Sequence, residues 1–336
     1  MERIKAYIGA RGYCPTPGLL ENFVLSLQCR PFVILTGYSG TDKTLLPRLT
    51  AEAMGATAEN GRYLGLRVSP DWMDSSDLFG WLNLEGKFIP GVITEFLARA
   101  HKDPDHPYFL CLDSLILSRA EYFLRDYVAA VESLGQENEQ PFVNLLYYGR
   151  DEAAAEKYGV IPALRNVFTV ATVDLDLEGR PLSRKLLDRV HTMTILPDSI
   201  TGTDTEAPAP AAEMGLLQNR YHALDQCPED ALEAGIALFE AVNRILTPAN
   251  TYIGYKLRND GILYLAHAKG YLPQTEAEDH VVCQKILTRL QCTTKTVPVL
   301  EKLGAFCRER GYGAACQALE TMVDKCRQTG VAAYWD

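Results

Sequence analysis

The feature that most constrains this sequence is a short run between an apolar segment and a helix-like one. Residues 32–35 (FVIL) predict a buried strand, residues 45–49 (LLPRL) predict a helix, and residues 37–44 (GYSGTDKT) connect them. The connection follows the spacing G-x-x-x-x-G-K-[ST], except that Asp42 stands where the pattern has its last glycine. Loops of this kind bind phosphate through backbone N–H groups and a helix N-terminus, so the run predicts an anion site.

The fixed positions of this loop have separate expected roles. Lys43 is expected to pair with the β- and γ-phosphates of a nucleotide, and the Thr44 hydroxyl is expected to hold Mg²⁺. The candidate nucleotide-binding residues are Gly37, Ser39, Gly40, Thr41, Asp42, Lys43 and Thr44.

Asp42 brings a negative charge to a loop suited to anions. At about 4 Å and an effective dielectric constant near ~20, a carboxylate repels one phosphate charge by roughly 4 kcal/mol. A free energy of this size weakens binding by about a thousandfold. Two alternatives stay open. The carboxylate turns to solvent and relieves the repulsion, or it pairs with Lys43 and removes the lysine from the phosphate.

Strand-like and helix-like segments alternate through the first part of the chain. After a helical lead-in over residues 1–30, further strands are predicted at 63–68, 108–112, 167–173 and 192–196, helices at 91–100, 120–134 and 183–190, and a hairpin insertion within 142–162. This alternation predicts an α/β fold with a parallel sheet flanked by helices. Polar residues at the carboxyl ends of the strands predict a ligand site there.

The second part of the chain predicts only helices. Residues 200–214 are rich in Thr, Pro and small residues, which is typical of a linker. Helices are predicted at 230–246, 253–269, 279–292, 297–310 and 313–328. We therefore expect an α/β domain at 1–199, a linker at 200–214 and an all-helical domain at 215–336.

Composition excludes several classes of protein. The net charge of −10 argues against a generally basic nucleic-acid-binding surface. No apolar run reaches the roughly 18 residues that a membrane-spanning helix needs, and the N-terminus has no signal-peptide core. The nine cysteines include no C-x-x-C pair. They predict reduced thiols of a cytoplasmic protein rather than metal ligands.

Several further motifs agree with one family. Besides residues 31–41, they comprise residues 68–72, 77–80, 83–88, 112–113, 117–123, 182–189, 253–260, 284–287 and 330–335. With these motifs the sequence resembles the AAA+ NTPases of the McrB type, which are the nucleotide-driven subunits of modification-dependent restriction systems and their antiphage-defence relatives. The resemblance covers nearly the whole chain, and it implies a P-loop sheet followed by a helical lid.

The resemblance also implies cofactors, partners and further site residues. It implies ATP or GTP with Mg²⁺, and it makes Asp113 the strand-end carboxylate that holds Mg²⁺ through water. Arg184 or Arg189 would act on the nucleotide of a neighbouring subunit; the alternative is that both are ordinary solvated or ion-paired side chains. The family implies a ring-type homo- or hetero-oligomer and a partner nuclease or effector. Because only residues 1–31 precede the first strand, any direct DNA contact is expected from a local pore loop.

Three catalytic positions of the family are altered, and Asp42 is the first. Ser114 stands where the family has the glutamate that activates water, and losing a positioned base costs about 10²–10⁴ in rate. Asp174 stands where the family has a sensor asparagine, and an ionised carboxylate cannot donate a hydrogen bond. Ile116 also replaces a usual asparagine. Asp113 and Asp174 have the alternative of plain structural roles at strand ends.

Three hypotheses follow from these departures. The first is a pseudo-ATPase that is kept as an assembly or regulatory subunit of a defence or restriction-type complex. The second is an active Mg²⁺-dependent ATPase or GTPase motor that drives DNA translocation or nuclease activation. The third is a monomeric binding module that reuses the fold. A serine nucleophile at Ser114 is a weaker idea, because no histidine lies nearby in the sequence.

Overall fold

A computed structural model of the chain describes residues 1–69, 71–72, 75–115, 123–134, 139–140, 143–144, 151–176, 182–196, 205–211 and 214–335. Contacts between residues divide the chain into two compact units. The sheet unit comprises Met1–Leu20 and Arg30–Gln218, and the helical unit comprises Glu21–Cys29 and Asn219–Asp336.

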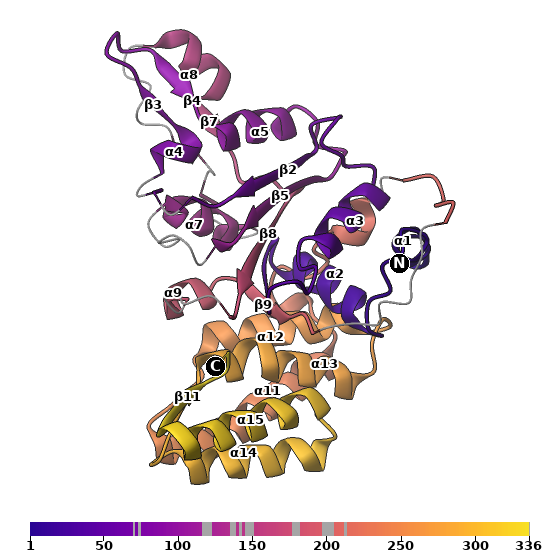
Figure 1. Cartoon of the computed structure of the whole chain (residues 1–336), viewed down its shortest axis with the longest axis vertical. Coiled ribbons are helices and arrows are strands. Elements are labelled where there is room, and N and C mark those ends of the chain that lie inside the picture. The colour runs from indigo at the N-terminus through magenta and orange to yellow at the C-terminus, as the bar shows by residue number, and fades with distance from the viewer. Residues whose placement is uncertain are drawn as a thin grey trace. The chain divides into compact units, whose positions relative to one another are not determined.

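The sheet unit is built on five parallel strands (Figure 1). In the order in which they lie side by side, these strands are β2 (Tyr63–Arg67), β5 (Tyr108–Asp113), β8 (Val167–Asp174), β1 (Phe32–Gly37) and β9 (His191–Thr194). The strands β1, β5 and β8 are buried along nearly their whole length, and they read in the sequence as largely apolar runs. The predicted α/β fold with a parallel sheet is confirmed.

Helices cover the sheet, which Figure 1 shows between α3 and α7. Among the described residues, the helices of this unit are α1 (Glu2–Ala10), α3 (Leu45–Ala53), α4 (Ser76–Phe79), α5 (Val92–His101), α7 (Arg125–Ser133), α8 (Glu152–Tyr158), α9 (Arg184–Leu187) and α10 (Met214–Leu217). Of the helix predicted at 120–134, residues 120–122 lie outside the described residues.

Two small antiparallel pairs of strands extend the sheet unit. One is a hairpin of β3 (Gly80–Leu82) and β4 (Phe88–Pro90), which the sequence did not predict. The other pairs β6 (Val143–Asn144) with β7 (Val160–Ile161). It lies where the sequence predicts a hairpin insertion within 142–162, but α8 lies between its two strands in the chain.

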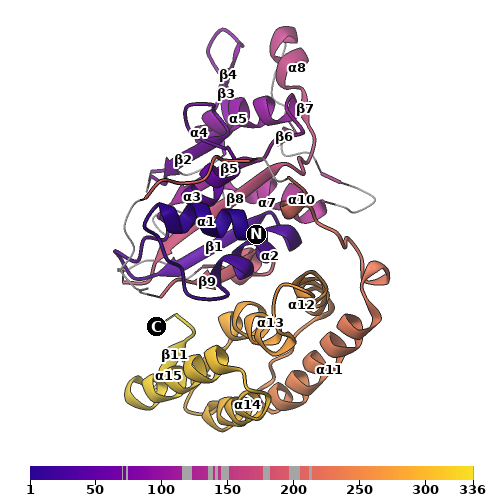
Figure 2. The ribbon, with the colours of Figure 1, turned by 90° about the vertical axis from the view of Figure 1, so that its right-hand side faces the viewer.

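The helical unit holds the C-terminal helices and most of α2 (Leu19–Cys29). Its other elements are η2 (Leu224–Gln226), α11 (Glu229–Leu246), η3 (Thr247–Ala249), α12 (Tyr255–Ala268), α13 (Gln274–Val281), η4 (Val282–Ile286), η5 (Leu287–Arg289), β10 (Gln291–Thr293), α14 (Val297–Arg310), α15 (Gly313–Thr329) and β11 (Val331–Ala333) (Figure 2). The predicted all-helical region is therefore confirmed, with one small antiparallel pair, β10 and β11, added.

One predicted helix of this unit is not continuous in the structure, so that prediction is wrong. The sequence predicts a continuous helix at 279–292, whereas α13 ends at Val281 and a π-helical turn and a 3-10 turn lead into β10. Pairing of β10 with β11 draws the chain out of the helix at Gln291. Periodicity alone cannot reveal this, because the partner strand lies at the far end of the chain.

The segment 21–29 is fixed in the helical unit by a buried amide. Asn22 Oδ1 accepts hydrogen bonds from the Tyr264 hydroxyl at 2.8 Å and from Gln284 Nε2 at 2.6 Å. In the predicted linker, by contrast, Thr205 and Ala211 donate backbone N–H groups to residues of the sheet unit. The predicted domain boundaries themselves stay a prediction.

Candidate functional site

The run 37–44 lies at the carboxyl edge of the sheet, between β1 and α3. Gly37 ends β1, where it lies opposite Asp174, the last residue of β8. A Cβ atom on Gly37 would lie 2.6 Å from the Ile195 carbonyl oxygen and 2.8 Å from Thr41 Oγ1, so this position requires glycine. Gly40 has φ +82°, the left-handed region that favours glycine. The backbone of the run is therefore shaped by its glycines into a tight turn that leads into a helix.

Asp42 adopts the backbone conformation that suits a glycine. Its φ is 51°, which aspartate tolerates better than most residues. Its side chain is exposed, and it forms no ion pair with any other residue that the structure describes. Of the two alternatives left open by the sequence, the orientation toward solvent is therefore the one observed.

Lys43 is bound by the protein itself. Its Nζ atom lies 2.7 Å from Asp174 Oδ1, 2.5 Å from the Tyr38 carbonyl oxygen and 3.4 Å from Thr41 Oγ1. The side chain is only 6% exposed. An ammonium group has three donors, and these three acceptors use all of them. The group expected to meet phosphate is engaged with a carboxylate instead.

A second carboxylate, Asp176, holds the other side of the loop. Asp176 Oδ1 accepts the Ser39 backbone N–H at 2.9 Å and the Ser39 hydroxyl at 3.1 Å. These hydrogen bonds, with Lys43 nearby, lower the pKa of Asp176. The sequence reading missed this residue. No local signal identified it, because β8 ends at Asp174 and residues 175–176 form a turn.

Asp113 and Ser114 are joined through the next strand. The Thr172 hydroxyl donates to Asp113 Oδ1 at 2.5 Å and accepts the Ser114 backbone N–H at 3.0 Å. Ser114 is 7% exposed and has φ 60°. Asp113 thus lies at the expected strand end, but one of its oxygens is committed to Thr172. Ile116 lies outside the described residues.

The two candidate arginines differ in their surroundings. Arg189 Nε lies 2.9 Å from Glu132 Oε2, and the Arg189 side chain is 34% exposed. Arg184 begins α9 and is exposed, and the Ser183 side chain caps this helix by accepting the Leu186 N–H. The interpretation of an ordinary ion pair is thus favoured for Arg189, and Arg184 is the arginine that faces solvent.

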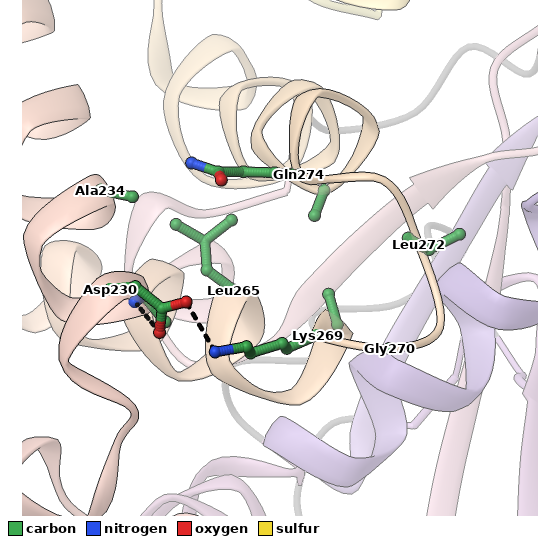
Figure 3. A pocket seen from close by; sticks show the side chains of 10 residues that line it. Asp230, Ala234, Leu265, Lys269, Gly270, Leu272 and Gln274 are labelled. Carbon is green, nitrogen blue, oxygen red and sulfur yellow. Dashed lines mark hydrogen bonds and ion pairs between the residues drawn. The ribbon is translucent and has the colours of Figure 1, made fainter.

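The helical unit also contains a cavity. It has a volume of about 170 Å³ and lies between α11, α12 and the start of α13 (Figure 3). Its lining is largely Ala and Leu, and its two charged groups, Asp230 and Lys269, pair with each other at 2.6 Å. None of the predicted site residues lines it, so the loop at 37–44 stays the stronger candidate.

Comparison with known proteins supports the fold but gives no established activity. A family model described as a domain of unknown function, DUF8727, matches residues 209–331. No curated protein matches the sequence. Among solved structures, a "putative ATPase" from Cytophaga hutchinsonii is similar with a TM-score of 0.53 at 14% identity, covering 85% of each chain. NtrX from Brucella abortus gives a TM-score of 0.32 at 16% identity, covering 86% of this chain and 53% of its own.

The first of these similarities shows a shared fold: a parallel sheet flanked by helices, then a helical region. The motif at residues 37–44 predicts a nucleotide with Mg²⁺ at this loop. The residues at 37–44 do not fit a nucleotide as they stand, because Lys43 and the Ser39 N–H already donate to carboxylates. In addition, no helix among the described residues is long and apolar enough to cross a bilayer.

Proposed function

We propose that this chain is a McrB-like AAA+ protein in which hydrolysis of nucleoside triphosphates is impaired. It would serve as an assembly or regulatory subunit of a defence or restriction-type complex in the cytoplasm. Its partners would be the other subunits of a ring, of the same or another kind, and a nuclease or effector.

The observation that carries this proposal is the ion pair of Lys43 with Asp174. At 2.7 Å and with Lys43 nearly buried, the ammonium has a partner that a nucleotide would have to displace. Hydrogen bonds between two charged groups are among the stronger ones in proteins. Phosphoryl transfer depends on the positioning and neutralisation of phosphate charge, and this lysine is a main source of both.

The residue after Asp113 supports the same conclusion. Ser114 carries a hydroxyl where a water-activating carboxylate is expected, and its backbone is fixed by Thr172. A serine hydroxyl is not a base at neutral pH, so the expected loss in hydrolysis rate is about 10²–10⁴. The two defects affect different steps, since one weakens phosphate binding and the other weakens activation of water.

Two features of the sheet unit are consistent with a role in assembly. The exposed Arg184 on α9 is free of any ion pair with the other described residues, and it could contact a neighbouring subunit. The hairpin of β3 and β4 exposes two large apolar side chains, Trp81 (53%) and Ile89 (40%). Exposed apolar patches often mark the sites where a protein contacts a partner.

Nucleotide turnover tests the proposal. Phosphate release from ATP and from GTP with Mg²⁺ would be measured for the wild type and for Lys43→Ala. We expect both proteins to give the same background rate. Mg²⁺-dependent turnover that disappears in Lys43→Ala would contradict the proposal and would favour the active-motor hypothesis, for which the retained Lys43, Thr44 and Asp113 are the supporting residues.

A further inference from the structure

We propose that Asp174 and Asp176 together act as a built-in substitute for the phosphate groups of a nucleotide, which keeps the loop at 37–44 ordered and closed to outside anions. This inference rests on the proposed function, and it names what regulates the same site. It also assigns a role to Asp176, which no sequence motif had indicated.

The geometry of the sheet places both carboxylates at the mouth of the loop. Asp174 lies directly opposite Gly37 in the parallel pairing of β8 with β1. One residue further, the Leu175 backbone N–H donates to the Gly37 carbonyl oxygen at 3.0 Å. The chain therefore stays hydrogen-bonded to the end of β1 as it passes the loop, and this hydrogen bond fixes the position of Asp176 beside the loop.

The donors that the two carboxylates occupy are the kind that binds phosphate. They are the Lys43 ammonium, one backbone N–H of the loop and the Ser39 hydroxyl, with donor–acceptor distances between 2.7 and 3.1 Å. A carboxylate resembles a phosphate group in being an anion that only accepts hydrogen bonds. Each donor is therefore satisfied as it would be by an anion from solution, but by the chain itself.

The two carboxylates differ in how strongly they hold their hydrogen-bond donors. Asp174 and Lys43 are 18% and 6% exposed, so water competes little for their ion pair. Asp176 and Ser39 are exposed, and their hydrogen bonds compete with water. We therefore expect Asp174 to contribute most of the closure and Asp176 to add a smaller part.

Asp42 provides the matched control. It carries the same charge and lies within the loop itself, but its carboxylate faces solvent and forms no ion pair with another described residue. If closure came from the mere presence of negative charge, Asp42→Gly would open the loop. If it comes from occupied donors, Asp42→Gly leaves the loop closed and only the variants at Asp174 and Asp176 open it.

The experiment measures binding of inorganic pyrophosphate, and of ATP with Mg²⁺, by isothermal titration calorimetry. The proteins are the full-length wild type, Asp42→Gly, Asp176→Asn, Asp174→Asn and Asp174→Asn with Asp176→Asn. We expect no measurable binding to the wild type or to Asp42→Gly. We expect binding to the double variant at least tenfold tighter than the wild-type limit, with Asp174→Asn intermediate and Asp176→Asn weaker.

Limited proteolysis with chymotrypsin gives a readout that does not depend on affinity. Tyr38 lies in the loop and is 54% exposed, so cleavage after it reports the order of the loop. We expect slow cleavage of the wild type with and without pyrophosphate. In the double variant we expect faster cleavage, which pyrophosphate slows.

Three results would overturn the inference. One is a double variant with wild-type circular dichroism that binds no pyrophosphate and is cleaved no faster. Another is tight binding by the wild type, and a third is a gain of binding in Asp42→Gly as large as in the double variant. None of these touches the proposed function, which fails only if the wild type hydrolyses nucleotide in a Lys43-dependent way.

Discussion

At the scale of single residues, the loop at 37–44 keeps its shape while its charge has changed. Asp42 has φ 51° and Gly40 has φ 82°, so the chain follows a path that glycines favour at both positions. Aspartate is one of the few residues that adopt this conformation readily. The substitution therefore costs the fold little, and its carboxylate faces solvent. This is why a pattern with one fault still predicts the strand, the turn and the helix correctly.

A steric prediction belongs to this scale. Gly37→Ala would place a Cβ atom 2.6 Å from a backbone oxygen, that of Ile195, which cannot move without disturbing β9. We expect a loss of about 1–3 kcal/mol in the free energy of unfolding, measured by urea denaturation. The control is Gly9→Ala in α1, where a Cβ meets nothing within 4 Å. That variant should be stabilised by up to about 1 kcal/mol. Equal effects of the two variants would contradict the steric argument.

At the scale of elements, a buried ion pair joins η4 to α12. Lys285, in the π-helical turn, lies 3.4 Å from Asp260 of α12, and the two side chains are 0% and 2% exposed. A buried charge that loses its partner is strongly destabilising, whereas an exposed pair contributes little. The π-helical turn η4 therefore interrupts the helix predicted at 279–292 at the place where Lys285 pairs with α12.

The corresponding prediction compares two lysines of the helical unit. Lys285→Met removes the ammonium that lies 3.4 Å from the buried Asp260 carboxylate, so we expect a loss of about 3–5 kcal/mol in the free energy of unfolding. Lys269→Met breaks the exposed pair with Asp230 and should cost less than about 1 kcal/mol. Urea denaturation followed by circular dichroism measures both. Similar losses in the two variants would mean that burial of the Lys285 pair is not what matters.

A pH prediction follows from α12. Burial lowers the pKa of His267 to about 4, and its Nε2 accepts the Arg220 backbone N–H at 3.0 Å while Nδ1–H donates to the Leu263 carbonyl oxygen. The folded pKa lies below the unfolded value, so the unfolded chain binds more protons as the pH falls below about 6.5. The contribution of His267 is complete at pH 7 and is lost toward pH 4.

Between pH 7 and pH 5 we therefore expect the free energy of unfolding to fall by up to about 2 kcal/mol on account of His267. His280, whose pKa burial also lowers to about 4, should add a similar amount. The measurement is urea denaturation at both pH values. His267→Gln should make the dependence shallower, and a variant as steep as the wild type would exclude His267 as a cause.

At the scale of the whole molecule, what the sequence could predict depends on distance along the chain. The strands and the loop are signalled by local runs, so they were predictable. Asp176 was not, because its partner Ser39 lies 137 residues away. Nor was the place of α2, which is fixed by bonds from Asn22 to residues 242 and 262 positions later. The altered residues Ser114 and Asp174 could be identified from the sequence, but the engagement of Asp174 with Lys43 required the fold.

The central claim is that the chain's own carboxylates occupy the predicted nucleotide site. The most direct measurement is a crystal structure of the wild type grown with Mg²⁺ and a non-hydrolysable ATP analogue. We predict no analogue at residues 37–44, with Lys43 still paired to Asp174 and Ser39 to Asp176. Phosphate density against Lys43, with Asp174 and Asp176 turned away from the loop, would contradict the account.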